Sequence, residues 1–218
     1  MKIIKNYING SEISISKETI PVEDPSKGEK IADVVMSSEA DFKLAIESAK
    51  NIQEEWSNTT PLKRSRVLSN YKSLIEKNTD ALAKIISEEH GKTFLDAKGS
   101  VTRGLEVVEF ACGIPHLLKG EFSQNVGTNI DSWSIRQPLG ICAGITPFNF
   151  PAMVPMWMYP ISIACGNSFI LKPSEKDPSC SNKLAELFSE AGLPNGVLNV
   201  IHGDKKIVDL ILNSSDIS

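Results

Sequence analysis

Polar and charged residues follow three short apolar segments in the second half of the chain. Residues 141–146 lead into a Pro-Phe-Asn-Phe-Pro turn, 168–171 into Lys-Pro-Ser-Glu-Lys, and 197–201 into His-Gly-Asp. Helical patterns separate these segments, so the order is β-α-β-α-β and predicts a parallel, doubly wound sheet. The carboxyl ends of parallel strands share one sheet edge, where ligands bind. The residues after each segment are therefore candidates for a functional site.

Asn149 lies between two phenylalanines and two prolines in an otherwise apolar segment. A buried amide without hydrogen-bond partners costs about 1–3 kcal/mol, so this side chain needs a partner. One interpretation is a turn residue satisfied by the local backbone. The other is an amide N–H that points into a pocket and stabilises a developing oxyanion.

Lys172 comes 26 residues after Thr146, near where dinucleotide-binding folds place the residue that contacts the adenosine ribose. Its ammonium, with Glu175 nearby, can bind ribose hydroxyls or a phosphate. The alternative is a lysine at a strand end, paired with a solvated glutamate. The sequence has neither the Gly-x-Gly-x-x-Gly fingerprint nor a Walker A loop, so the usual pyrophosphate-binding turn is missing.

The cysteines and histidines predict no metal site. No Cys-x-x-Cys pair occurs, and His90, His116 and His202 are far apart. Cys180 opens a predicted helix, whose N-terminus can lower a thiol pKa, but no histidine or lysine partner is identifiable for any cysteine. We expect four structural, reduced thiols, as is usual in the cytoplasm: Cys112, Cys142, Cys165 and Cys180.

The composition is that of an average soluble globular protein. Of 218 residues 41% are hydrophobic and 23% charged, which excludes collagen-like and disordered classes. The net charge is −4 without a basic patch, so neither nucleic acid nor an anionic membrane is an expected partner. Residues 137–171 carry no charge, yet prolines at 147, 151, 155 and 160 interrupt them, so we expect a buried strand–turn–helix–strand and not a membrane span. The N-terminus resembles neither a secretory signal nor a transit peptide, which favours a cytoplasmic location.

The first 120 residues predict a short β region followed by helices. Asn9-Gly10 indicates a hairpin within 5–20, a turn is expected over 22–28, and a strand over 31–36. Ser38 with Asp41 forms a capping-box pattern, and Thr60-Pro61 is typical of a second helix start. Asn78 or Thr79 is expected to start a third helix that ends at Gly91, and a fourth helical region spans 93–118. Alternating residues in 121–139 predict a surface hairpin or a strand that pairs with another subunit.

Three motifs together resemble those of the aldehyde dehydrogenase superfamily, in order and at the expected spacing: ITPFNFP at 145–151, ILKPSE at 170–175 and AGLPNGVLNV at 191–200. Two more, RGLEVVEFACG at 103–113 and MVPMWMYP at 153–160, resemble the CoA-acylating methylmalonate-semialdehyde dehydrogenases. The resemblance implies an α/β fold with N-terminal helices, half of a Rossmann-like doubly wound parallel sheet and a protruding β-hairpin. The implied parts are an N-terminal hairpin and helical part (1–120), an oligomerisation hairpin (121–139) and the first half of the NAD-binding domain (140–218).

The resemblance also implies roles for individual residues. Asn149 is the oxyanion-hole asparagine, and Arg103 binds the substrate carboxylate. Thr146 and Phe148 line the nicotinamide side of the NAD site. The adenosine ribose is held by Lys172, Glu175 and Lys176. The implied reaction oxidises a small semialdehyde by way of a thioester on a cysteine. Coenzyme A then accepts the acyl group, and CO₂ is lost. The resemblance also implies a homo-oligomer joined through the hairpin.

The family's nucleophilic cysteine and general-base glutamate lie beyond position 218. We therefore expect an N-terminal part of such an enzyme that turns over no aldehyde alone and leaves an unpaired sheet edge. Two alternatives remain: part of a hydrolytic enzyme, for instance of the succinate-semialdehyde type, or a non-catalytic module that binds nucleotide or pairs with a complete subunit.

Overall fold

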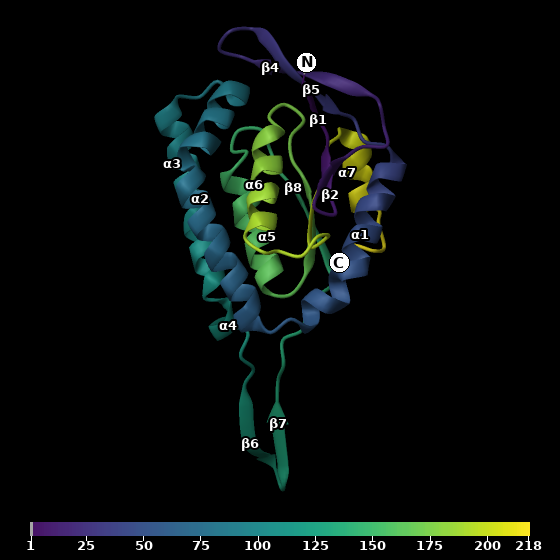
Figure 1. The fold of residues 1–218 in the computed structure, drawn as a ribbon. Coiled ribbons are helices and arrows are strands. Elements are labelled where there is room, and N and C mark those ends of the chain that lie inside the picture. Colours follow the sequence, from purple (N-terminus) through teal and green to yellow (C-terminus); the bar gives the residue numbers. More distant parts are fainter. Residues whose placement is uncertain (1) are drawn as a thin grey trace.

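The computed structural model describes residues 2–218 and has a central five-stranded sheet with helices on both faces (Figure 1). Its strands, in spatial order, are β3 (Ser11–Ile13), β2 (Asn6–Ile8), β10 (Leu198–Val200), β9 (Ser168–Lys172) and β8 (Ile141–Ile145). The last three are mutually parallel, as the β-α-β-α-β pattern predicts. The predicted α/β fold with a doubly wound parallel sheet is confirmed.

The N-terminal hairpin extends this sheet. Asn9 and Gly10, both with positive φ, form the two-residue turn between β2 and β3, and β2 pairs antiparallel with β10 through Tyr7 and Val200. The third parallel strand is thus covered on both sides. Among the parallel strands, β8 lies at an edge of the sheet, where Ile141 forms a bridge to Ile217.

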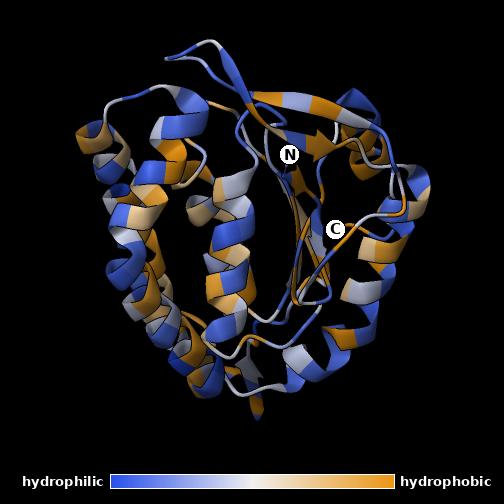
Figure 2. Cartoon of the chain, turned by 45° about the horizontal axis from the view of Figure 1, so that its top comes forward, coloured by the Kyte–Doolittle hydropathy of each residue, from blue (hydrophilic) through white to orange (hydrophobic). Residues whose placement is uncertain are grey.

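Both faces of β9 and β10 are buried, which explains why their sequences are mostly apolar. Along β9, Phe169 and Leu171 face a cluster built with α2 (Pro61–His90), α3 (Phe94–Cys112), α5 (Met153–Ala164) and α6 (Ser179–Glu190). Ile170 faces the opposite cluster, with α1 (Glu39–Asn58) and α7 (Lys205–Leu212). Figure 2 shows the apolar residues concentrated on the strands and the inner helix faces. The uncharged segment 137–171 accordingly folds as β8, α5 and β9.

Most predicted helix starts are confirmed, and one is wrong. The Ser38–Asp41 capping box opens α1, Thr60 caps α2, and Gly91 ends α2 with a φ of 81°. Helix α2 is continuous through Asn78 and Thr79, so no third helix starts there. The Asn78 amide donates to the Leu74 carbonyl and the Thr79 hydroxyl to the carbonyls of Ile75 and Glu76. These side chains therefore form hydrogen bonds to the preceding turn of their own helix and do not cap a new one. Tertiary packing stabilises the helix through this point.

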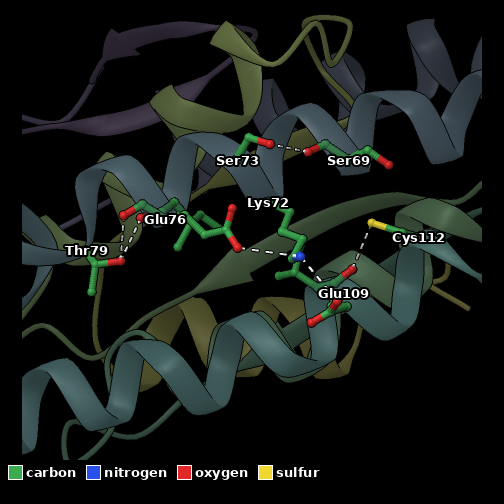
Figure 3. Close-up of polar contacts among 9 residues, drawn as sticks. Ser69, Lys72, Ser73, Glu76, Thr79, Glu109 and Cys112 are labelled. Atoms are coloured by element: carbon green, nitrogen blue, oxygen red, sulfur yellow. Dashed lines mark hydrogen bonds and ion pairs between the residues drawn. The ribbon is translucent and has the colours of Figure 1, made fainter.

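Polar contacts between α2 and α3 lie outside the apolar cluster to which both helices contribute. Lys72 on α2 lies 3.2 Å from Glu109 on α3 and 3.5 Å from Glu76 on its own helix (Figure 3). Within α3, Cys112 donates from its thiol to the Val108 carbonyl. These exposed ion pairs contribute about 0–1 kcal/mol each, so the alignment of the two helices comes mainly from their apolar faces.

A second small sheet lies over one end of the molecule. It consists of β1 (Ile3–Ile4), β5 (Glu29–Val35) and β4 (Thr19–Asp24), in that order. The predicted strand at 31–36 is confirmed, but the predicted turn at 22–28 is too long. Pairing with β5 keeps residues 22–24 extended, and the turn is confined to residues 25–28.

Residues 121–139 protrude from the body as a two-stranded ribbon (Figure 1). After α3 and the short α4 (Ile114–Leu117), strands β6 (Phe122–Gly127) and β7 (Ile130–Trp133) pair antiparallel. Phe122 is 66% and Trp133 67% exposed, so the ribbon presents large apolar side chains to solvent. Among residues 2–218, no helix is both long and apolar enough to cross a membrane.

Helices α3 and α5 lie close together at Gly104. A Cβ atom built there would lie 2.3 Å from the Met156 Cε, 3.1 Å from its Cβ and 3.3 Å from the Met153 Cα. By contrast, a Cβ built at Gly99, on the same helix, meets nothing within 4 Å. The absence of a side chain at Gly104 therefore sets how closely the two helices pack.

We expect Gly104→Val to lower the free energy of unfolding by about 1–3 kcal/mol, because the added atoms overpack this contact. Gly99→Ala is the matched control and should raise stability by about 0.5–1 kcal/mol, since alanine is the better helix former. Urea-induced unfolding measures both. Equal effects of the two substitutions would contradict the close approach at Gly104.

Candidate functional site

The carboxyl ends of β8 and β9 bring Thr146 and Lys172 together. Ile145 pairs with Lys172 in the sheet register, and the Thr146 backbone N–H donates to the Lys172 carbonyl at 3.1 Å. The Thr146 side chain is buried, and its hydroxyl has no hydrogen-bond partner among the described residues. A buried hydroxyl without a partner is costly, so this position suits a ligand that carries a polar group.

Lys172 and Glu175 form an ion pair beside Thr146. Their Nζ and Oε2 atoms are 3.0 Å apart, and the lysine side chain is only 6% exposed. Burial acts to raise the pKa of Glu175, but hydrogen bonds from its own backbone and from Lys172 outweigh it and lower the pKa. Within residues 2–218 Glu175 is the one hydrogen-bond acceptor of the ammonium, which leaves two of its three N–H donors for a ligand.

The turn after β8 exposes the next two predicted site residues. Phe148 is 49% exposed, stacks with His90 at 6.2 Å between ring centroids, and has the Lys176 ammonium 4.8 Å from its centroid. Asn149 is exposed too, so the interpretation as a buried amide is wrong. Its backbone carbonyl accepts a hydrogen bond from Lys92, and its side chain has no hydrogen-bond partner among residues 2–218.

Arg103 lies on α3, next to the close contact at Gly104, and its guanidinium is exposed. Its backbone carbonyl accepts a hydrogen bond of 3.4 Å from the indole of Trp157 on α5, the helix that follows the Asn149 turn. The structure therefore places Arg103 against the helix that continues from Asn149. The sequence reasoning assigned no role to Trp157, which is 46% exposed although it belongs to an apolar helix.

Three of the cysteines and His202 are unsuited to reaction. Burial raises the pKa of Cys112, Cys165 and Cys180, so these thiols stay protonated, and Cys180 is wholly enclosed despite opening α6. His202 follows β10 but is fully buried, with its Nε2 3.0 Å from Asn182 Oδ1. Burial, together with the Lys172 charge, lowers the His202 pKa to about 3 and keeps it neutral.

A cavity of about 390 Å³ adjoins the Phe148 side of the site. Its lining includes two buried carboxyl groups that sequence reasoning missed, Glu89 at the end of α2 and Asp177 before α6. Glu89 accepts a hydrogen bond from the Ser179 backbone N–H, whereas neither Asp177 oxygen has a partner among the described residues. Burial first, and the nearby Glu89 charge second, raise the pKa of Asp177 to about 8.

Asp177 should make the protein less stable as the pH rises. The folded state retains a proton on Asp177 up to about pH 8, while the unfolded chain, with an ordinary pKa of 3.8, releases it earlier. The contribution of Asp177 to stability is therefore greatest below pH 3.8 and falls up to pH 8, by at most about 1.4 kcal/mol per pH unit. We expect Asp177→Asn to stabilise the protein increasingly across this range, as urea unfolding at several pH values would show. Parallel stability curves for wild type and variant would refute the assignment.

Comparison with known proteins places these residues in a family. The family model for the aldehyde dehydrogenase family matches residues 13–218. A malonate-semialdehyde dehydrogenase of Pseudomonas aeruginosa is 53% identical over the whole chain, which spans 44% of that relative. A mitochondrial methylmalonate-semialdehyde/malonate-semialdehyde dehydrogenase of Dictyostelium discoideum is 50% identical over 98% of the chain and 40% of its own length.

Solved structures give the same result. The fold superposes with a TM-score of 0.98 on a Sinorhizobium meliloti protein described as a methylmalonate-semialdehyde dehydrogenase in complex with NAD, which is 52% identical. The superposition covers all of this chain and 45% of that one. A methylmalonate-semialdehyde dehydrogenase of Oceanimonas doudoroffii also reaches a TM-score of 0.98 at 49% identity, covering all of this chain and 44% of its own. The chain thus spans somewhat less than half the length of the relatives it matches, and it belongs to the aldehyde dehydrogenase family.

Proposed function

We propose that this chain supplies the oxyanion amide, the substrate-carboxylate arginine and part of the NAD site of a malonate- or methylmalonate-semialdehyde dehydrogenase that acylates coenzyme A. The observation that carries the proposal is the sheet edge where a backbone hydrogen bond joins Thr146 to Lys172 and the turn bearing Asn149 begins. Relatives with this activity in their names are about half identical over the whole chain.

The sheet edge at the carboxyl ends of β8 and β9 is suited to binding a dinucleotide. The buried Thr146 hydroxyl without a partner and the two spare N–H donors of Lys172 are groups that a polar ligand satisfies. Lys172, Glu175 and Lys176 would hold the adenosine ribose, and Thr146 with Phe148 would line the nicotinamide side. When bound, NAD supplies the hydride acceptor. The binding of NAD by the S. meliloti protein supports this assignment.

Asn149 is proposed to stabilise the negative oxygen that forms when a thiolate adds to the aldehyde. Its amide N–H carries a positive partial charge and lies on an exposed turn, within reach of a substrate. The nucleophilic cysteine and the general-base glutamate are proposed to come from the part of the longer relatives that the match does not cover. Burial and raised pKa values argue against Cys112, Cys165 and Cys180 in that role.

Arg103 is proposed to bind the carboxylate that distinguishes a semialdehyde from a simple aldehyde. Its planar guanidinium matches a carboxylate with two parallel hydrogen bonds, and it is exposed beside α5. A carboxylate β to a carbonyl is poised for loss of CO₂, and coenzyme A is the proposed acceptor of the acyl group.

We propose that the chain is divided into the three parts that the family resemblance implies. Residues 1–120 form the N-terminal hairpin and helical part, 121–139 the oligomerisation hairpin, and 140–218 the first half of the NAD-binding domain. The ribbon's exposed Phe122 and Trp133 support a homo-oligomer through it, because a monomer gains nothing from large apolar side chains in water. A cytoplasmic location is proposed on the bacterial relatives, although the D. discoideum relative is mitochondrial.

The reaction is best tested in a joined enzyme, in which residues 1–218 precede the part of the P. aeruginosa malonate-semialdehyde dehydrogenase that the match does not cover. We expect malonate or methylmalonate semialdehyde to yield NADH continuously with coenzyme A present, together with acyl-CoA and CO₂ by mass spectrometry. The 218-residue chain alone is the control and should yield no NADH. NADH formation indifferent to coenzyme A would favour the hydrolytic alternative, and turnover by the control would overturn the proposed source of the nucleophile.

In the same enzyme, Asn149→Ala should lower kcat by about 10²–10³, the usual effect of removing one oxyanion donor. Asn51→Ala, which removes an exposed amide from α1, is the matched control and should leave kcat unchanged. Steady-state kinetics at saturating NAD measures both. A kcat unaffected by Asn149→Ala would remove Asn149 from the oxyanion role.

A further inference from the structure

The corner between α2 and α3, residues 90–92, contacts three consecutive residues of the turn that carries Asn149. The His90 ring stacks with Phe148, the Lys92 ammonium donates to the Asn149 carbonyl at 2.8 Å, and the same ammonium lies 4.6 Å from the Phe150 ring centroid. A segment more than fifty residues earlier in the chain thus forms the support beneath the turn.

Two helix caps hold this corner. Gly91 ends α2 in the left-handed conformation, with its N–H bonded to the Ser87 carbonyl at 3.0 Å. Thr93 caps α3, accepting a hydrogen bond from the Asp96 N–H through its hydroxyl. Lys92 stands between the two caps, so its backbone is defined by both helices.

The Lys92 side chain is 8% exposed, so its charge needs close acceptors. The nearest carboxylate, on Asp96, is 3.8 Å away and belongs to a side chain that is 67% exposed. The Asn149 carbonyl is a full ångström closer. The main-chain oxygen of the turn is therefore the principal partner of this ammonium.

The turn has few other restraints at its midpoint. Its beginning is held where the Thr146 N–H donates to the Lys172 carbonyl, and its end where the Val154 N–H donates to the Phe150 carbonyl. The exposed Asn149 side chain has no hydrogen bond to any of residues 2–218. The bond from Lys92 is thus what defines the orientation of the peptide after Asn149, and with it the direction in which the amide side chain leaves the backbone.

We propose that Lys92 is a positioning residue, whose ammonium holds the Asn149 peptide so that the amide is aimed at the developing oxyanion before substrate arrives. This inference rests on the proposed function, because it acts through the role of Asn149 there. It assigns to Lys92 no contact with substrate or cofactor. Loss of the Lys92 contact should lower kcat, because an oxyanion donor misplaced by about 1 Å loses much of its stabilisation of the transition state.

The test in the joined enzyme compares Lys92→Met, which keeps the apolar stem and removes the donor, with Lys92→Arg, which restores a cationic donor. We expect Lys92→Met to lower kcat about 10–100-fold with the KM for NAD changed less than about twofold, and Lys92→Arg to recover most of the loss. Lys98→Met is the matched control, since this lysine on α3 pairs only with exposed Asp80 at 2.7 Å and should leave kcat unchanged.

A double-mutant cycle separates this inference from the proposed function. If Lys92 acts through Asn149, then Lys92→Met added to Asn149→Ala lowers kcat no further. A large effect of Asn149→Ala with none of Lys92→Met would overturn the positioning role alone. Independent, additive losses would overturn it as well, because Lys92 would then act by another route.

Hydrogen–deuterium exchange of the 218-residue chain provides a readout that does not depend on activity. Lys92→Met should speed exchange in a peptide that covers residues 146–151 and leave peptides of β9 and α6 unchanged. Lys92→Arg should exchange like the wild type in all three. Unchanged exchange in the turn, or faster exchange throughout the chain, would contradict the inference.

Discussion

The parallel alignment of β8, β9 and β10 is the constraint on which the rest of the structure depends. Because the strands run in the same direction, Thr146, Lys172 and His202 emerge at one edge, and the bond from the Thr146 N–H to the Lys172 carbonyl joins two of them. Parallel strands need crossover helices, and these cover both sheet faces with apolar clusters. The antiparallel β2 then covers the outer side of β10.

Asn149, on its turn, and Arg103, on α3, both have their backbone carbonyls bound by elements distant in sequence. Lys92 at the α2–α3 corner binds the Asn149 carbonyl, and Trp157 of α5 binds the Arg103 carbonyl. Both contacts use a side-chain donor on one helix-bearing segment and a main-chain acceptor on another. A backbone acceptor leaves the functional side chain free, so the amide and the guanidinium remain exposed while their backbones are fixed.

Buried ionisable groups surround this exposed edge, and each meets the cost of burial differently. Lys172 forms a 3.0 Å ion pair with Glu175, and His202, whose pKa is lowered by burial, remains neutral beside Asn182. Asp177 has no hydrogen-bond partner among the described residues. Because its pKa is raised, its ionisation in the folded state lowers the free energy of unfolding. Ionisation of Asp177 therefore lowers the stability of the folded protein as the pH rises.

Local patterns in the sequence were enough to predict the β-α-β-α-β order, the Ser38–Asp41 capping box, the Asn9-Gly10 hairpin turn and the glycine end of α2, because each depends on residues a few positions apart. They failed at Asn78 and Thr79, where apolar packing against α3 and α6 continues a helix that local signals would interrupt. They also misplaced Asn149, because an apolar neighbourhood in sequence does not decide burial. Only the tertiary structure decided that Lys92 supports the Asn149 turn and that Glu89 and Asp177 share a cavity, since these contacts join residues 57 or more positions apart and leave no local trace.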